Sequence, residues 1–270
     1  MEFKNKVYDG DFEVAEVSIE NEGQIFRGIL YFPQEKYEKP YPLIIYFHGF
    51  PQLFSLKEII QNYEYLLNLG FAFLIFNFRG YKYSEGTISI KSQVSDSFKV
   101  IEFIEKMAAH DIFNLNNINI LAHDFGAYIA LILSSKVKII NKLLLLTPIL
   151  DLQRHVESEE FYKALAYINR FLPGTVRGLD NIPDFIKMTK KEVSKKAYKI
   201  EKVIQRLKNK ELKVITGGID KITPVVEVER IFKKCNMKPQ LVIIESMQHE
   251  YIDEDDIEKI KSEIKKFFNV

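Results

Sequence analysis

Polar or glycine-rich segments follow several short apolar runs of the sequence, and three of these segments carry side chains that could catalyse a reaction. Asp124 comes shortly after the run Ile118–Leu121, Asp220 follows a pair of glycines, and His249 comes late in the chain. A carboxylate can attack an electrophilic carbon, and a histidine oriented by a second carboxylate can take a proton from water. The sequence therefore predicts nucleophilic catalysis by Asp124, with His249 and Asp220 as its partners.

The elements that must position these side chains are predicted from the periodicity of the apolar residues. Two N-terminal segments alternate apolar and polar residues as half-exposed strands do, and Asn21-Glu22-Gly23 forms a turn between them. The later runs are continuously apolar, which is typical of parallel strands covered on both faces. The predicted strands are Phe12–Ile19, Gln24–Phe32, Leu43–Phe47, Phe71–Phe76, Ile118–Leu121, Leu143–Leu146, Leu212–Ile215 and Leu241–Ile244.

Helical stretches alternate with the strands from residue 43 onward. This alternation predicts an α/β fold with a mostly parallel, eight-stranded sheet and helices on both of its faces. Ligands of such sheets bind beyond the ends of the strands, where the three candidate residues are expected to meet. The predicted helices are Leu56–Leu69, Val94–Ala109, Gly126–Ser135, Val225–Lys234 and Glu254–Phe268.

One segment interrupts this alternation. Residues 151–210 contain no convincing strand but several tyrosines and a lysine-rich helix near Lys190–Lys208. A helical insertion between two strands commonly forms a lid over the active edge of a sheet. We therefore expect an α/β core of residues 1–150 and 211–270 with a lid of residues 151–210, in which at least one of Tyr162, Tyr167 and Phe171 faces Asp124. The alternative is a pair of ordinary surface helices.

Five motifs carry a resemblance to the α/β-hydrolase superfamily, and it covers residues 12–150 and 211–270. His48–Pro51 resembles the His-Gly-x-Pro motif, and Arg79–Ser84 resembles the Arg-Gly-x-Gly-x-Ser loop, with Lys82 in place of its second glycine. Ala122–Gly126 matches the turn that carries the nucleophile. Gly218–Asp220 and His249 lie where this superfamily has its acid and its histidine. The order of nucleophile, acid and histidine is that of the superfamily.

The resemblance implies the roles of the residues next to the nucleophile. The tight strand-to-helix turn needs small residues two positions away on each side, and Ala122 and Gly126 meet this need. The backbone N–H of Phe125, at the start of a helix, and that of Phe50 would form the oxyanion hole. His48 would lie at the substrate site, where the residue of this motif more often braces the oxyanion loop than reacts.

Aspartate at the nucleophile position is a departure from most of the superfamily, which has serine there. Members with aspartate resemble epoxide hydrolases and dehalogenases. A carboxylate suits attack on a saturated carbon, and His249 would then activate the water that hydrolyses the resulting ester. Phe125 stands where dehalogenases have a halide-binding tryptophan. Tyr162 and Tyr167 are available as the lid tyrosines that protonate the oxygen of an opening epoxide.

A second interpretation follows from the N-terminal strands and the Ser84-Glu85-Gly86 loop, which look more like the serine esterase and prolyl-peptidase-like branch. On this interpretation the nucleophilic serine of a carboxylesterase-like scaffold has been replaced by Asp124. The protein would then be inactive, or would bind a ligand without catalysis. The sequence leaves both interpretations open.

The composition narrows the range of partners. The net charge is +1 with one cysteine and no tryptophan, so we expect no nucleic-acid or membrane partner, no internal disulfide and no cysteine-based zinc site. The polar N-terminus predicts no secretory signal, and hence a cytoplasmic protein. Phe50, Phe54 and Phe125 favour a small, fairly apolar substrate, without a metal or an organic cofactor. The oligomeric state stays open, with a homodimer among the alternatives.

Overall fold

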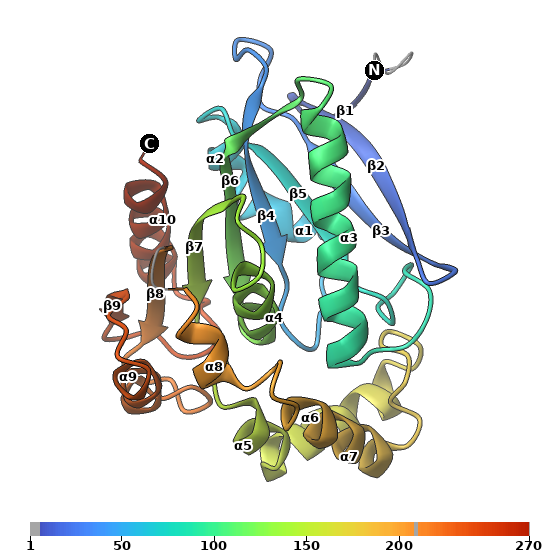
Figure 1. The fold of residues 1–270 in the computed structure, drawn as a ribbon, viewed down its shortest axis with the longest axis vertical. Coiled ribbons are helices and arrows are strands. Elements are labelled where there is room, and N and C mark those ends of the chain that lie inside the picture. Colours follow the sequence, from blue (N-terminus) through green and yellow to red (C-terminus); the bar gives the residue numbers. More distant parts are fainter. Residues whose placement is uncertain (1–5, 208–209, 270) are drawn as a thin grey trace.

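A mostly parallel β-sheet forms the centre of the molecule, as the computed structural model shows for residues 6–207 and 210–269 (Figure 1). Its strand order is β1-β2-β3-β5-β4-β6-β7-β8-β9, with β1, β2 and β3 antiparallel to their neighbours and the remaining pairs parallel. The strands are β1 Val7–Asp9, β2 Phe12–Asn21, β3 Gln24–Tyr31, β4 Tyr41–Phe47, β5 Ala72–Asn77, β6 Phe113–His123, β7 Ile140–Leu146, β8 Glu211–Gly217 and β9 Gln240–Ile244.

The α/β class and the mostly parallel sheet are confirmed, but the predicted number of eight strands is wrong. The sheet has nine strands over the described residues, because Val7–Asp9 adds a short edge strand to β2. Three residues are too few for the alternation that reveals longer strands.

Helices cover both faces of the sheet, as the continuous apolar strands require. Helices α3 (Ile90–Ala108), α4 (Phe125–Ser134), α8 (Ile200–Ile204) and α9 (Val225–Lys234) contribute to one apolar core, and α1 (Leu56–Gln61), α2 (Glu64–Leu67) and α10 (Glu254–Phe268) contribute to the other. Every helix in the described part of the chain is too short or too polar to cross a lipid bilayer.

The predicted helix Leu56–Leu69 is wrong, because the structure divides it into α1 and α2 at Tyr63. The backbone of Tyr63 leaves the helical region, with φ −125° and ψ 4°. Its ring is buried and stacks on Phe73 with a centroid separation of 5.7 Å. Tertiary packing of this aromatic ring thus outweighs the helical pattern around it.

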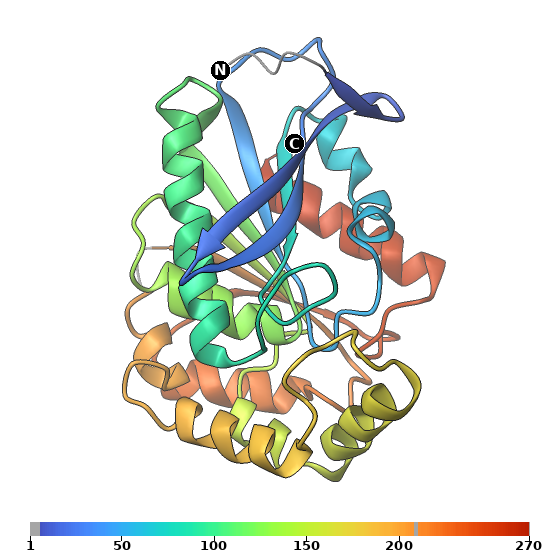
Figure 2. The same ribbon diagram turned by 90° about the vertical axis from the view of Figure 1, so that its right-hand side faces the viewer.

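The insertion forms α5 (Leu152–Val156), α6 (Glu159–Phe171), α7 (Ile182–Val193) and α8. In two views at right angles, α5, α6 and α7 lie below the ends toward which the parallel strands point (Figures 1 and 2). The continuous lysine-rich helix predicted near 190–208 is wrong over its described part, because α7 ends at Val193 and α8 begins at Ile200. The break lets Ile200, Val203 and Ile204 pack into the core beside α4.

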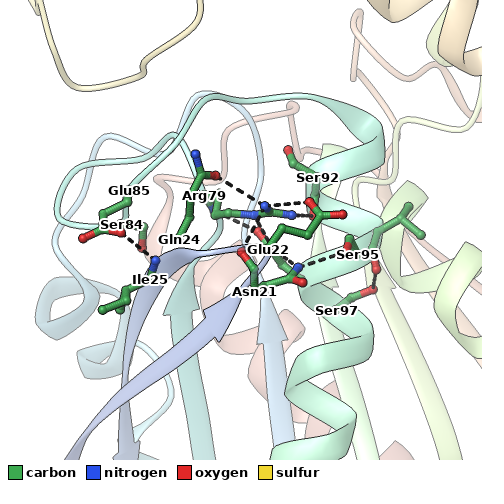
Figure 3. A network of polar contacts seen from close by, with 12 residues as sticks. Asn21, Glu22, Gln24, Ile25, Arg79, Ser84, Glu85, Ser92, Ser95 and Ser97 are labelled. Atoms are coloured by element: carbon green, nitrogen blue, oxygen red, sulfur yellow. Dashed lines mark hydrogen bonds and ion pairs between the residues drawn. The ribbon is translucent and has the colours of Figure 1, made fainter.

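A buried ion pair fixes the loop 79–86 beside the sheet (Figure 3). Arg79 Nε donates to Asp96 Oδ1 at 2.6 Å, and the Arg79 backbone N–H donates to Asp96 Oδ2 at 2.9 Å. The guanidinium also contacts Glu22 at 2.9 Å. Arg177, from the insertion, donates to the carbonyls of Lys82 and Gly86. Arg79 therefore connects the loop 79–86 to α3 and to the turn between β2 and β3. Arg177 connects the insertion to the same loop.

Replacing Arg79 by alanine is expected to lower the free energy of unfolding by about 3–5 kcal/mol, because Asp96 would be left buried without its partner. Urea unfolding followed by circular dichroism measures the change. The control is Lys99→Ala, which removes an ion pair with Glu102 at the surface and should cost less than about 1 kcal/mol. Equal losses of unfolding free energy for the two variants would show that the buried Arg79 pair stabilises the fold no more than a surface pair does.

Candidate active site

Asp124 occupies a tight turn between β6 and α4, with backbone angles of φ 51° and ψ −120°. Few residues other than glycine adopt a positive φ, and such outliers gather at functional sites. Gly126 allows the turn to approach β4, since a Cβ there would lie 2.4 Å from the carbonyl oxygens of Phe47 and His48. The structure therefore places Asp124 as the sequence motif predicted, at the end of a central strand.

The two carboxylate oxygens of Asp124 have different surroundings. Oδ2 accepts a hydrogen bond of 2.7 Å from the backbone N–H of Phe50. The Phe125 backbone N–H, at the first position of α4, lowers the pKa of the same carboxylate. Gly49 makes room for this arrangement, because a Cβ at that residue would lie 2.7 Å from Oδ2. Of the two amides predicted to form an oxyanion hole, that of Phe50 thus already donates to a carboxylate of the protein.

The other oxygen faces the histidine. His249 Nε2 lies 3.2 Å from Asp124 Oδ1, and His249 Nδ1 lies 2.9 Å from Asp220 Oδ2. Asp220 is itself fixed, because its Oδ1 accepts from the backbone N–H groups of Ile222 and Thr223, each at 2.8 Å. The structure thus brings together the three residues that the sequence predicted would converge, from the ends of β6, β8 and β9.

Burial of these groups competes with their mutual attraction. Burial alone would lower the pKa of His249, but its hydrogen bonds and opposite charges with Asp124 and Asp220 raise that pKa to about 10. Burial alone would raise the pKa of Asp124, but the hydrogen bond and charge of His249 lower it to about 2. At neutral pH the free protein therefore holds Asp124 as a carboxylate and His249 as an imidazolium.

The protonation state of His249 is expected to depend on the charge of Asp124. In the wild type, the ring signals of His249 in NMR spectra should not titrate between about pH 6 and 8. In Asp124→Asn the pKa of His249 should fall by at least about one unit, because the hydrogen bond to Asp124 is the largest of the interactions that raise it. Unchanged titration in Asp124→Asn would contradict this coupling.

The same pKa values determine how the pair affects stability. The folded pKa of His249 is raised, so its stabilising contribution is complete below about pH 6.5 and is lost as the pH rises through about 10. The folded pKa of Asp124 is lowered, so its contribution is lost as the pH falls from 3.8 through about 2. The pair stabilises the fold most in the mildly acidic range between these limits.

Three residues predicted to bind substrate lie elsewhere. His48 is buried just after β4, where Nε2 accepts from the Phe78 backbone N–H at 3.3 Å and Nδ1 lies 2.8 Å from the Gly49 carbonyl oxygen. Both ring nitrogens are therefore occupied by the backbone. Tyr162 and Tyr167 are 46% and 56% exposed on the outer face of α6, as is Phe171 at 56%. The predictions that place these side chains against the substrate are wrong.

Two other residues of the insertion line the space above Asp124. A cavity of about 470 Å³ is bounded by Asp124, His249, Phe50, His155 and Phe161, among others. The ring of His155 packs at a tilt of 58° against that of Phe161, with a centroid separation of 4.8 Å, and burial lowers the pKa of its imidazole. The sequence showed no partner for His155. One signal was present, since Phe161, Leu165 and Ile168 repeat at helical spacing and so identify the inner face of α6.

Asp151, which also follows a central strand, has a structural role. It is the N-cap of α5, where its Oδ1 accepts from the Arg154 backbone N–H at 3.2 Å, and its Oδ2 pairs with Arg230. Within the described ranges no three His, Cys, Asp or Glu side chains are placed to hold a metal ion.

A comparison with protein families agrees with this geometry. The model of the alpha/beta hydrolase fold matches residues 42–222, more than half of the chain. The chain belongs to this family. The predicted family and fold are thereby confirmed and, at the level of the family, so is the prediction of a hydrolase. No curated protein sequence matches the chain significantly.

Solved structures show the same fold over nearly the whole chain. Est1E from Butyrivibrio proteoclasticus is 18% identical, with a TM-score of 0.69 over 93% of this chain and 96% of that one. An esterase from Pyrococcus furiosus is 19% identical, with a TM-score of 0.70 over 96% of this chain and 90% of that one. The α/β hydrolase GrgF from a Penicillium species is 18% identical, with a TM-score of 0.69 over 94% and 97%. At these identities the likeness shows the fold alone.

Proposed function

We propose that the protein is a hydrolase in which Asp124 attacks a saturated carbon that bears an oxygen leaving group, an epoxide above all. The observation that carries this proposal is that the two carboxylate oxygens of Asp124 have different partners. Oδ2 accepts from Phe50 at 2.7 Å, while Oδ1 lies beside His249 at 3.2 Å. The first oxygen is suited to become the carbonyl oxygen of an ester, and the second is suited to form the new bond to carbon.

The first half of the reaction forms that ester. Asp124 Oδ1 bonds to the carbon, the carbon–oxygen bond of the epoxide breaks, and its electron pair stays on the leaving oxygen. Esterification removes the negative charge of Asp124, whose hydrogen bond and charge raise the pKa of His249. The imidazolium can then release its proton, and the alkoxide takes one up. The products are a neutral hydroxyalkyl ester and a neutral imidazole.

The second half hydrolyses the ester. Neutral His249, oriented by Asp220, takes a proton from water as the water oxygen attacks the ester carbonyl carbon. Negative charge develops on Oδ2, which already accepts from the Phe50 amide, so little reorganisation is needed. Collapse releases a diol and restores the carboxylate and the imidazolium.

The same geometry disfavours the ordinary esterase route. The carbonyl oxygen of an ester substrate would have to displace Oδ2 from the Phe50 amide, and attack by Asp124 would give a mixed anhydride. The second candidate function, a scaffold that binds a ligand without catalysis, is supported by the resting ion pair of Asp124 and His249, since an imidazolium is not a base.

Assays of the wild-type protein on styrene oxide and on p-nitrophenyl butyrate test the proposal. We expect diol formation from the epoxide and no ester hydrolysis above that of a heat-denatured sample. Hydrolysis of the ester with no turnover of the epoxide would contradict the proposed chemistry. Silence on both substrates would favour the non-catalytic candidate.

A further inference from the structure

A second cavity, of about 410 Å³, also reaches Asp124 and has no part in the steps above. It shares Asp124, Phe50, Pro51 and Glu250 with the cavity of about 470 Å³, which we call the lid cavity. Its remaining walls come from β4 and the loop after it, from α1 and the turn after it, from the end of β6 and from the segment after β9. We call it the tyrosine chamber and define it by Tyr46, Tyr63, Tyr251, Gln52 and His123. Its volume is in the range of small-molecule sites.

The tyrosines of the chamber form a neutral, hydroxyl-bearing wall. Tyr46 and Tyr63 are each 4% exposed, and their rings lie 5.4 Å apart. The hydroxyls of Tyr63 and Tyr251 lie 3.4 Å apart, a long contact that leaves capacity for a third partner. Burial raises the pKa of each of these phenols, so they stay protonated at physiological pH.

Two further polar atoms of the chamber lack a partner within the described part of the protein. Gln52 is only 5% exposed, and its Nε2 is buried and makes no hydrogen bond to the described residues. Nε2 of His123 is likewise buried without a partner, and burial lowers the pKa of its imidazole. Buried polar groups in native proteins are usually hydrogen-bonded, so two unpaired atoms beside one cavity indicate a missing ligand or water.

The mouth of the chamber is apolar. Leu53, Phe54 and Ile252 are 39%, 62% and 88% exposed there, which is unusual for large apolar side chains. The Lys82 ammonium, in place of the family's glycine, donates to the carbonyl oxygens of Leu53 (2.6 Å) and Phe54 (2.5 Å) and so holds this rim. Of the residues that line the chamber only Asp124 and Glu250 are charged, and both are acidic.

We propose that the tyrosine chamber is a second substrate compartment, which binds a neutral, largely apolar arm carrying one hydroxyl or carbonyl oxygen. The apolar rim admits the arm, and the phenols, Gln52 and His123 supply neutral hydrogen-bond partners for its oxygen. A carboxylate is disfavoured because the walls offer no cation and already contain acidic groups. The inference rests on the proposed function only in taking Asp124 as the reacting centre between the two cavities.

The absence of tryptophan from the chain allows a direct binding test. In Phe54→Trp the single tryptophan sits at the chamber rim. In Phe161→Trp it sits in the lid cavity, and in Phe171→Trp on the outer face of α6. Each protein keeps Asp124 and is titrated with 4-phenyl-1-butanol, which has no leaving group for a carboxylate, then with 4-phenylbutanoate and 4-phenylbutylamine.

We expect the alcohol to change the fluorescence of Phe54→Trp saturably and to leave Phe171→Trp unchanged. The carboxylate should bind at least about tenfold more weakly, because the charged residues of the chamber are acidic. The amine should bind no more tightly than the alcohol, because its ammonium loses its hydration among neutral phenols. Gln52→Leu in the Phe54→Trp protein should weaken binding of the alcohol about fivefold, through loss of one hydrogen bond. Matched unfolding midpoints with and without Gln52→Leu show that the fold is kept.

Three outcomes would overturn the inference. They are a response of Phe161→Trp alone, tighter binding of either charged probe, or affinity that Gln52→Leu leaves unchanged. Because the probe does not react, a negative result says nothing about Asp124 as nucleophile. Conversely, a finding that Asp124 forms no ester would not change the expected binding of the alcohol in the chamber.

Discussion

Asp124→Ser is expected to lower turnover of an epoxide by about four orders of magnitude or more, without creating esterase activity. A serine hydroxyl is too weak a nucleophile to open an epoxide at neutral pH unless a base activates it. The Oγ atom of serine takes the place of Cγ in aspartate, so it would lie up to about 1.2 Å farther from His249 than Oδ1 does. Oδ1 is already 3.2 Å from Nε2, so little hydrogen bonding to the base would remain.

The assay compares wild type, Asp124→Ser and Asp184→Ser on one epoxide and one p-nitrophenyl ester. Asp184 is an exposed carboxylate in the first turn of α7, so its variant controls for a general effect of the substitution. A wild type that is silent on both substrates, together with an Asp124→Ser protein that hydrolyses the ester, would reject the account. It would show instead that the site is that of a serine esterase, blocked by the carboxylate.

His249→Gln is expected to reduce turnover of the epoxide by about three to four orders of magnitude, because glutamine cannot take a proton from water. The loss should fall on the second half of the reaction. Asp124 keeps its carboxylate and its bond from the Phe50 amide, and water can replace the imidazolium as the proton source for the alkoxide. The first half should therefore continue, and ester should accumulate. A burst in rapid-quench kinetics that consumes one equivalent of epoxide per protein, with no matching release of diol, measures this separation.

The matched control is His110→Gln, because His110 is exposed and lies between α3 and the start of β6, whereas Asp124 follows the end of that strand. It should leave both halves of the reaction unchanged. Equal slowing of the burst and of the steady state in His249→Gln would mean that the histidine acts before the ester forms, contrary to the proposed mechanism.

The parts of the site that could be predicted from the sequence have local signals. The turn at Asp124 needs small neighbours at fixed spacing, and each continuous apolar strand ends at the same edge of the sheet. Asp124, Asp220 and His249 could therefore be placed before any contact was known. The fold class followed from the same runs, and only the three-residue strand Val7–Asp9 escaped, because it shows no period.

The parts that were missed depend on contacts between distant segments. Tyr162 and Tyr167 were chosen for their chemistry, but the buried residues of α6 set its orientation and turn both tyrosines outward. The tyrosine chamber joins Tyr46, Tyr63 and Tyr251 from three elements that are remote in sequence. No spacing within the chain indicates that these side chains meet, so only the three-dimensional structure reveals the chamber.

The central claim is that Asp124 forms a covalent ester, and intact-protein mass spectrometry of His249→Gln after incubation with styrene oxide tests it most directly. The account predicts that the mass rises by that of one epoxide molecule, that proteolysis assigns the added mass to the peptide containing Asp124, and that Asp124→Asn/His249→Gln stays unmodified. An unmodified His249→Gln protein, tested with an epoxide that the wild type converts to diol, would contradict the account.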